Sequence, residues 1–227
     1  SIQPFRPKYQ GGSMIEIENI LEIEKYLDGI KVVIFDLDDT LYSEKDYVKS
    51  GYEAIASEFP SINDMAKKLW AVFERGGKSI DEVLLSENIF SDETKAKCLQ
   101  IYRNHKPNIS LYPGVGEMLE RLNNHGIKLG IITDGRQEGQ RAKIEALGIA
   151  NLFNKIVITD ELGGIEYRKP NSEAFIKMKE YFDTPFEQMF YVGDNINKDF
   201  IAPQKLGMKF GWFKNSIGIY MNERKRL

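Results

Sequence analysis

The stretch "VVIFDLDDTLY", residues 32–42, places four apolar side chains directly before three aspartates, Asp36, Asp38 and Asp39. A short apolar run of this kind is typical of a strand that is covered on both faces. Carboxylates this close repel one another, and each resists the loss of water on burial. We therefore expect a cation or a reacting group to lie at the tip of this strand.

The composition limits the classes of partner. The chain has 227 residues, of which 42% are hydrophobic and 29% charged, as in ordinary globular domains, so disordered and collagen-like classes are excluded. The net charge of −3 provides no overall basic field for a nucleic acid polymer or an anionic membrane. The expected partner is therefore a small soluble molecule.

Cysteine usage and hydropathy suggest a location. The single cysteine, Cys98, excludes an internal disulfide and favours a reducing compartment. The apolar runs are far shorter than a membrane helix requires, and no charged-then-apolar leader opens the chain, so we expect a cytoplasmic protein. The first residues, "SIQPFRPKYQGGSM" (1–14), predict a linker, either vector-derived or joining this chain to a larger parent protein, and the sequence favours neither.

Short apolar runs recur along the chain and alternate with segments of helical period in its second half. The runs lie at 32–35, 129–132, 156–158, 189–192 and 208–213. This alternation predicts an α/β fold with a doubly wound parallel sheet. Residues 45–107 break the rhythm with the apolar stripes of successive helices, and this insertion is too long for a tight crossover. We expect a small all-helical domain at 45–107, a sheet domain at 30–44 and 108–227, and a tail and lead-in segment at 1–29.

Polar residues follow several of the predicted strands. In an open α/β sheet the functional site lies outside the carboxyl ends of the strands. The residues expected there are Asp36, Asp38, Thr133, Asp134, Lys169, Asp194 and Asp199. Each residue type is common in loops, but together they predict one site with several carboxylates, a hydroxyl and an ammonium.

Four motifs in this order resemble those of the haloacid dehalogenase (HAD) superfamily. They are "FDLDDTL" (35–41), "IITDG" (131–135), "RKP" (168–170) and "VGDNINKD" (192–199). "LYPGV" (111–115) and "EGQRAKIEALGI" (138–149) are similar to the branch with a helical cap inserted after the first motif. The resemblance covers residues 30–213 and implies a Rossmann-like core with a small helical cap domain.

The resemblance also implies a role for each motif residue. Asp36 would be the nucleophile and Asp38 the general acid and base, while Thr133 and Lys169 would hold the phosphoryl group, with Asp134 and Gly135 in the same substrate-binding loop. Mg²⁺ would be bound by Asp36, the backbone carbonyl of Asp38 and Asp194, with Asp199 as a ligand or as the residue that orients a bound water. Asp39 stands where many relatives have glycine, and we expect it to have a structural or electrostatic role.

The residue types suit this chemistry. A phosphate monoester repels a carboxylate nucleophile, so a hard cation and an ammonium are needed to permit its approach. Oxygen ligands of this kind suit Mg²⁺. Attack by Asp36 would form an aspartyl phosphate. The leaving oxygen then needs a proton and the later water must lose one, and Asp38 can do both if burial and neighbouring carboxylates raise its pKa.

The predicted function is a phosphatase that hydrolyses a small phosphorylated metabolite, a sugar phosphate or a nucleoside monophosphate. Three alternatives stay open. A phosphomutase would differ only in its products. A dehalogenase would use the same nucleophile, but such relatives lack an acid at the position of Asp38. A non-catalytic or regulatory module of a larger protein would not need every catalytic position to be filled.

Overall fold

The computed structural model of the protein describes residues 14–219. Residues 1–13 of the predicted linker lie outside the described residues. The chain divides into two compact units, which are described separately. The sheet unit comprises residues 14–44 and 110–219 of the described chain, and the helical unit comprises residues 45–109.

The sheet unit is built on six parallel strands, which confirms the predicted α/β class. The strands are β1 (Ile15–Ile17), β2 (Val32–Phe35), β3 (Lys128–Thr133), β4 (Lys155–Ile158), β5 (Met189–Gly193) and β6 (Lys209–Phe213). Their order in the sheet is β1-β6-β5-β2-β3-β4. Beginning at β2, the chain adds β3 and β4 on one side and then returns to add β5 and β6 on the other. The sheet therefore has a topological switch point between β2 and β5, where α/β sheets commonly bind ligands.

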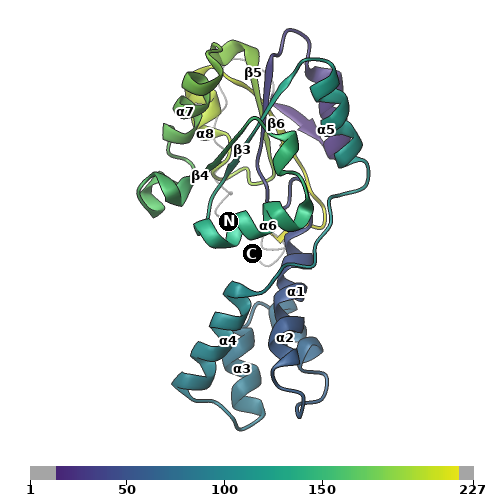
Figure 1. The fold of residues 1–227 in the computed structure, drawn as a ribbon, viewed down its shortest axis with the longest axis vertical. Helices are drawn as coiled ribbons and strands as arrows, with labels where there is room; N and C mark the ends of the chain where they lie inside the picture. The colour runs from purple at the N-terminus through teal and green to yellow at the C-terminus, as the bar shows by residue number, and fades with distance from the viewer. Residues whose placement is uncertain (1–13, 220–227) are drawn as a thin grey trace, which may run out of the picture. The chain divides into compact units, whose positions relative to one another are not determined.

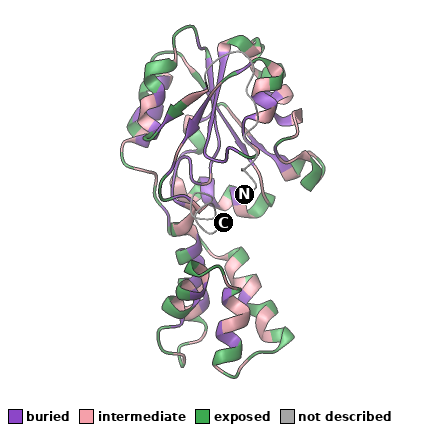
Figure 2. Ribbon diagram, turned by 180° about the vertical axis from the view of Figure 1, so that it is seen from behind, coloured by how far each residue is buried: buried purple, intermediate pink, exposed green. Residues whose placement is uncertain are grey.

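Helices cover both faces of the sheet (Figure 1). They are α5 (Val115–Asn124), α6 (Gln137–Leu147), α7 (Glu173–Phe182) and α8 (Ile201–Leu206), with 3-10 turns η1 (Ile20–Tyr26), η2 (Ala150–Leu152), η3 (Thr159–Leu162), η4 (Ile165–Tyr167) and η5 (Phe186–Gln188). Helix α5 lies on one face, while α7 and α8 lie on the other, and α6 runs across the edge where the strands end. The central strands β2, β3 and β5 are almost entirely buried between these layers, as the purple strands in Figure 2 show, which explains their continuous apolar sequence.

The helical unit contains four helices. The first of them, α1, begins at Glu44, where the first segment of the sheet unit ends. The four helices are α1 (Glu44–Ser57), α2 (Met65–Glu74), α3 (Ser79–Ser86) and α4 (Asp92–Asn104). Their apolar stripes form a small core that includes Ile55, Leu69, Leu84 and Cys98, each of which is fully buried. The helical pattern read from the sequence is therefore present, and no strand interrupts residues 45–109.

The start of the described chain differs from the sequence-based expectation. Residues 1–29 were expected to lie outside the sheet domain, but β1 pairs with β6, with Ile15 opposite Gly211 and Ile17 opposite Phe213. A strand of three residues is too short to show a period in the sequence. Its place at the edge of the sheet is decided by pairing with a strand almost 200 residues later.

None of the helices within residues 14–219 is long and apolar enough to cross a membrane.

The packing of α7 on the sheet can be tested at Phe175. Its side chain is fully buried, and its ring packs edge-on against that of Tyr191 with 5.0 Å between the ring centroids. We expect Phe175→Ala to lower the free energy of unfolding by about 3–5 kcal/mol, because it removes this packing and leaves a cavity. Urea denaturation followed by circular dichroism measures the change. Ile165→Ala, at a residue 70% exposed, is the control and should change stability little; equal losses in both variants would contradict this account of the core.

Candidate active site

Asp36 stands at the tip of β2, between the two neighbouring strands. Its backbone N–H donates to the carbonyl of Val192 at 2.9 Å, so the sheet ladder fixes the residue just beyond the end of β2. Its carboxylate is buried and accepts a hydrogen bond at 2.9 Å from the Nζ of Lys169. The expected nucleophile is thus held at the switch point of the sheet.

The ammonium of Lys169 is buried among acidic and phenolic oxygens. Its Nζ lies 2.9 Å from Asp36 Oδ1, 3.1 Å from Asp199 Oδ1 and 2.8 Å from the hydroxyl of Tyr191. Burial alone would lower the pKa of Lys169, but the carboxylates of Asp199 and Asp36 raise it well above its usual value. Lys169 therefore provides a fixed positive charge beneath the site.

Two further carboxylates come from the loop after β5. Asp194 accepts a hydrogen bond at 3.3 Å from the hydroxyl of Thr40, and Asp199 Oδ2 accepts one at 2.8 Å from the backbone N–H of Asn195. The loop passes close to β5 at Gly193, where a Cβ would lie only 2.6 Å from Asp199 Oδ2. A glycine is needed there to make room for this carboxylate.

Asp36, Asp194 and Asp199 form a cluster that suits a hard divalent cation. Each offers a carboxylate oxygen, and these oxygens lie within 4.8 Å of one another. Asp199 Oδ1 is buried and, apart from its ion pair with Lys169 at 3.1 Å, makes no hydrogen bond within the described chain. Burial raises the pKa of Asp36 to about 6 and that of Asp194 well above its usual value, because neighbouring carboxylates add to the cost of desolvation. A set of oxygens this short of positive charge fits Mg²⁺.

Asp38 has a separate set of partners. Its Oδ1 accepts hydrogen bonds from the hydroxyl of Tyr42 and, at 2.9 Å, from the Nζ of Lys143, and its Oδ2 accepts one at 2.9 Å from the side-chain amide of Gln140. A raised pKa was the condition under which Asp38 was predicted to transfer protons, and the substrate-free site does not meet it. Burial does raise the pKa, but the Lys143 ammonium and these hydrogen bonds outweigh burial and lower the pKa below its usual value.

Thr133 and Asp134, at the end of β3 and directly after it, form hydrogen bonds that connect several parts of the site. Thr133 is buried at the end of β3, and its hydroxyl accepts a hydrogen bond from the amide of Gln140. Asp134 accepts hydrogen bonds from the Thr159 hydroxyl at 3.0 Å, the backbone N–H of Lys169 at 3.1 Å and the Lys198 ammonium at 2.8 Å. Three loops are therefore tied together through one carboxylate. The adjoining Gly135 has φ +136°, a conformation that favours glycine.

Asp39 has a structural role. It adopts a left-handed backbone conformation with φ +56°. Its carboxylate accepts hydrogen bonds from the backbone N–H groups of Glu44 and Ile219, both at 2.9 Å, while its carbonyl accepts one from Asn215. These contacts join the chain after β2 to the segment after β6.

These residues surround a small cavity at the carboxyl edge of the sheet. Its volume is about 160 Å³, and it is lined by Asp36, Asp38, Glu44, Asp134, Arg168, Asp194, Asn195 and Lys198. The predicted residues Asp36, Asp38, Asp134 and Asp194 thus face one space, and the buried Thr133, Lys169 and Asp199 lie behind them. The cavity has room for a phosphate-sized group with a small substituent.

Several residues of the site were not identified from the sequence. They are Tyr42, Glu44, Gln140, Lys143, Tyr191 and Lys198. Gln140 and Lys143 lie three residues apart on the buried side of α6, where they interrupt an apolar stripe. A lysine in such a stripe was a usable signal, because lysine is almost never fully buried without a partner.

The raised pKa of Asp36 predicts a stability difference in metal-free protein. A carboxyl whose pKa is about 6 in the folded state and near 3.8 when unfolded stabilises the fold fully below pH 3.8, and this contribution is lost as the pH rises through 6. Asp36→Asn is neutral throughout, so with chelator present we expect it to be more stable than wild type at pH 8, by up to roughly 3 kcal/mol, with the gap closing toward pH 4. Denaturation curves at several pH values measure this.

Asp28→Asn is the control for this prediction, since it removes a carboxylate from an exposed turn. Its denaturation curves should follow those of wild type. An Asp36→Asn protein no more stable than wild type at pH 8 would show that burial of Asp36 carries no such cost.

Comparisons with known proteins identify the family of this chain. The haloacid dehalogenase-like hydrolase family matches residues 33–213. Glyceraldehyde 3-phosphate phosphatase of Methanopyrus kandleri is 30% identical over 193 residues, which are 79% of this chain and 82% of that protein. Pyrophosphatase PpaX of Oceanobacillus iheyensis is 24% identical over 187 residues, which are 80% of this chain and 82% of that protein.

Solved structures share the fold at lower identity. A HAD-superfamily hydrolase of subfamily IA from Geobacter sulfurreducens has a TM-score of 0.61 and 19% identity, over 82% of this chain and 88% of that chain. The HAD-hydrolase YfnB from Bacillus subtilis, solved bound to magnesium, has a TM-score of 0.56 and 23% identity, over 81% and 86% of the two chains. The match over most of the sequence shows that the chain belongs to the haloacid dehalogenase-like hydrolase family.

Proposed function

We propose that the protein is a Mg²⁺-dependent phosphatase that hydrolyses a small phosphate monoester through an aspartyl phosphate on Asp36. The observation that carries the proposal is the cluster at the switch point of the sheet, where Asp36 shares the Lys169 ammonium with Asp199 and lies beside Asp194. A nucleophilic carboxylate, a fixed ammonium and further acidic oxygens are the groups that phosphoryl transfer needs.

The residues available for the metal are those of the acidic cluster. Asp36, Asp194 and the backbone carbonyl of Asp38 would hold Mg²⁺, with Asp199 as a further ligand or orienting group. When bound, the ion would neutralise charge on the carboxylates and the phosphoryl oxygens, so that the two can approach each other.

The protein side chains then divide the chemistry between two carboxyl groups. A carboxylate oxygen of Asp36 attacks phosphorus, a new O–P bond forms, and the ester O–P bond breaks with its electron pair kept by the leaving oxygen. Asp38 gives that oxygen a proton, and in the second step it takes a proton from the water that attacks the aspartyl phosphate. Lys169 and Thr133 bind the phosphoryl oxygens.

The lowered pKa of Asp38 is compatible with this role. In the substrate-free site burial raises the pKa of Asp38, but the Lys143 ammonium and the hydrogen bonds to the carboxylate outweigh burial and favour the charged form. A phosphate group in the cavity brings negative charge next to Asp38, which disfavours the carboxylate and allows it to carry the proton.

The substrate class we propose is a short sugar phosphate. Five relatives that are 28–30% identical to this chain carry the name glyceraldehyde 3-phosphate phosphatase. The helical unit, residues 45–109, would act as the cap that selects the leaving group and excludes water.

Release of inorganic phosphate tests the proposal. The panel contains glyceraldehyde 3-phosphate, larger sugar phosphates and nucleoside monophosphates, each with Mg²⁺ or with chelator. We expect release from the triose phosphate to require Mg²⁺ and to fall by at least about 10³-fold in Asp36→Asn, because the nucleophile is lost. Asp28→Asn, which removes an exposed carboxylate, should keep wild-type activity.

Two other results would contradict the proposed phosphatase activity and would each indicate a different function. An isomeric phosphate ester formed without free phosphate would identify a phosphomutase. A protein whose melting temperature rises with Mg²⁺ but which turns over no ester would be a non-catalytic module, since binding to the folded state alone stabilises it.

A further inference from the structure

Three side chains donate hydrogen bonds to the carboxylate of Asp38. Oδ1 accepts from Tyr42 and Lys143, and Oδ2 accepts from Gln140. A carboxylate oxygen has two acceptor positions, so these contacts fill both positions on Oδ1 and one on Oδ2. The remaining position belongs to Oδ2, and Asp38 borders the cavity.

Lys143 is an unusual residue for the buried side of a helix. Its side chain is only 8% exposed, and its Nζ lies 2.9 Å from Asp38 Oδ1. Taking an ammonium out of water is unfavourable, and a well-placed carboxylate must offset this cost. The core of the sheet unit would be served as well by an apolar side chain, so the pair indicates a role at Asp38.

Gln140 contacts Asp38 from the same side of α6 as Lys143. Residues three apart on a helix lie on one side, so Gln140 and Lys143 reach Asp38 together. The amide of Gln140 also donates to the hydroxyl of Thr133. Helix α6 therefore connects the side chain of Asp38 to the end of β3.

We propose that Lys143, assisted by Gln140, is a positioning residue that fixes the carboxyl of Asp38 with Oδ2 directed at the leaving oxygen of the substrate. This inference rests on the proposed phosphatase function and names the residues that make its proton transfer efficient. A general acid must lie within hydrogen-bond reach of the atom it protonates, and a misplacement of about 1 Å costs on the order of 100-fold in rate. Without Lys143 the carboxyl would keep only its contacts with Tyr42 and Gln140 and would be held less firmly about its χ2 torsion.

The leaving group provides a readout that separates positioning from structural support. An alkoxide leaves slowly unless it is protonated, whereas p-nitrophenolate leaves as a stable anion. The ratio kcat/KM covers the steps up to phosphoryl transfer to Asp36, so it reports on protonation of the leaving oxygen. A defect in positioning Asp38 should therefore lower kcat/KM for glyceraldehyde 3-phosphate far more than for p-nitrophenyl phosphate.

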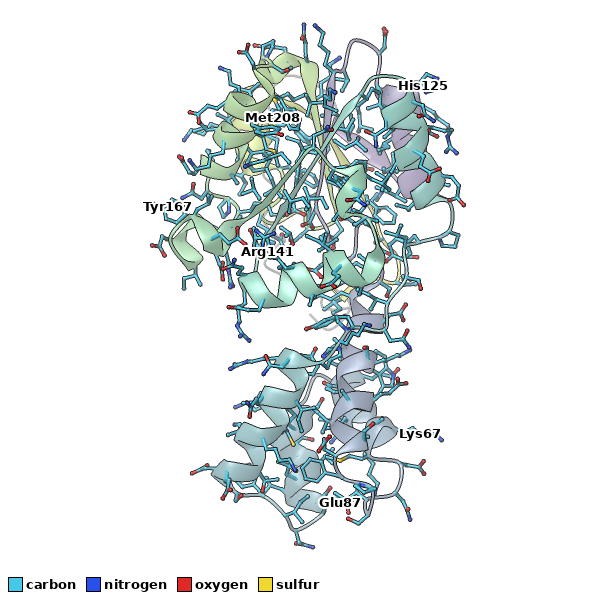
Figure 3. The ribbon with its side chains drawn as sticks, in the orientation of Figure 1. Lys67, Glu87, His125, Arg141, Tyr167 and Met208 are labelled. Atoms are coloured by element: carbon cyan, nitrogen blue, oxygen red, sulfur yellow. The ribbon has the colours of Figure 1, made fainter. Side chains whose placement is uncertain are left out.

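The experiment compares Lys143→Met with Arg141→Met, both made in the full chain. Arg141, labelled on α6 in Figure 3, is exposed and pairs with Glu161 at 2.8 Å, so it controls for loss of a positive charge from the same helix. We expect Lys143→Met to lower kcat/KM for the triose phosphate by about 10²–10³-fold and that for the aryl ester by less than about fivefold. Arg141→Met should leave both values unchanged.

A double-mutant cycle identifies the partner. Asp38→Asn should show the same dependence on the leaving group, and Lys143→Met added to it should cause no further loss, because the two act through one carboxyl. Gln140→Met, which removes the other α6 donor, should give a smaller effect of the same pattern and tests the inference independently if Lys143→Met does not fold.

Equal losses for both esters would overturn the inference, since Lys143 would then bind phosphate or support the fold. Independent, additive losses in the cycle would overturn it as well. Failure of the proposed function has a different appearance: wild type and Arg141→Met would then release no phosphate from either ester, and the positioning role would fall with it.

Discussion

The rest of the site depends on the ion pairs that the buried ammonium of Lys169 makes with Asp36 and Asp199. The parallel sheet brings carboxylates from β2 and from the loop after β5 to one edge, where they repel one another and lose hydration. Lys169 lies 2.9 Å from Asp36 and 3.1 Å from Asp199 and so offsets part of this charge. The loop that carries it is secured in turn by Asp134, which binds its backbone N–H. The fold therefore holds the Lys169 ammonium in place as well as the carboxylates.

The pKa values of Asp36 and Asp38 shift in opposite directions, although only one residue separates them in sequence. The reason is that the two carboxyls have different ammonium and hydrogen-bond partners. Asp36 has the Lys169 ammonium beside it, but Asp199 competes for the same charge, and burial raises the pKa of Asp36 to about 6. Asp38 is half-buried, and the loss of water raises its pKa as well, yet the contact with Lys143 and two further donors lowers it below its usual value. Environments that separate the pKa values of neighbouring carboxyls are how one site obtains two chemical roles. On the proposed function these roles are nucleophile and proton carrier.

The sequence predicted the parts of this structure that depend on local pattern. Buried strands are continuous apolar runs, so β2, β3, β4, β5 and β6 were recognisable, as was the polar residue after each of β2, β3 and β5. Parts that depend on distant pairing were not. The three residues of β1 become a strand only because β6 lies alongside, and Lys143 finds Asp38 only after α6 crosses the edge of the sheet. For the same reason the direction of the Asp38 pKa shift could not be read from its neighbours in sequence.

The acidic cluster destabilises the fold, and its affinity for a hard cation explains why the chain would retain it. Raised pKa values at Asp36 and Asp194 mean that protons and a divalent cation compete for the same oxygens. Near neutral pH, without either occupant, the cluster stores unfavourable charge that Lys169 offsets only in part. A cation or a proton that binds there regains this energy, so the cost to stability and the affinity for a hard cation have the same origin. Replacing the cluster by apolar side chains would strengthen the fold and remove the function we propose.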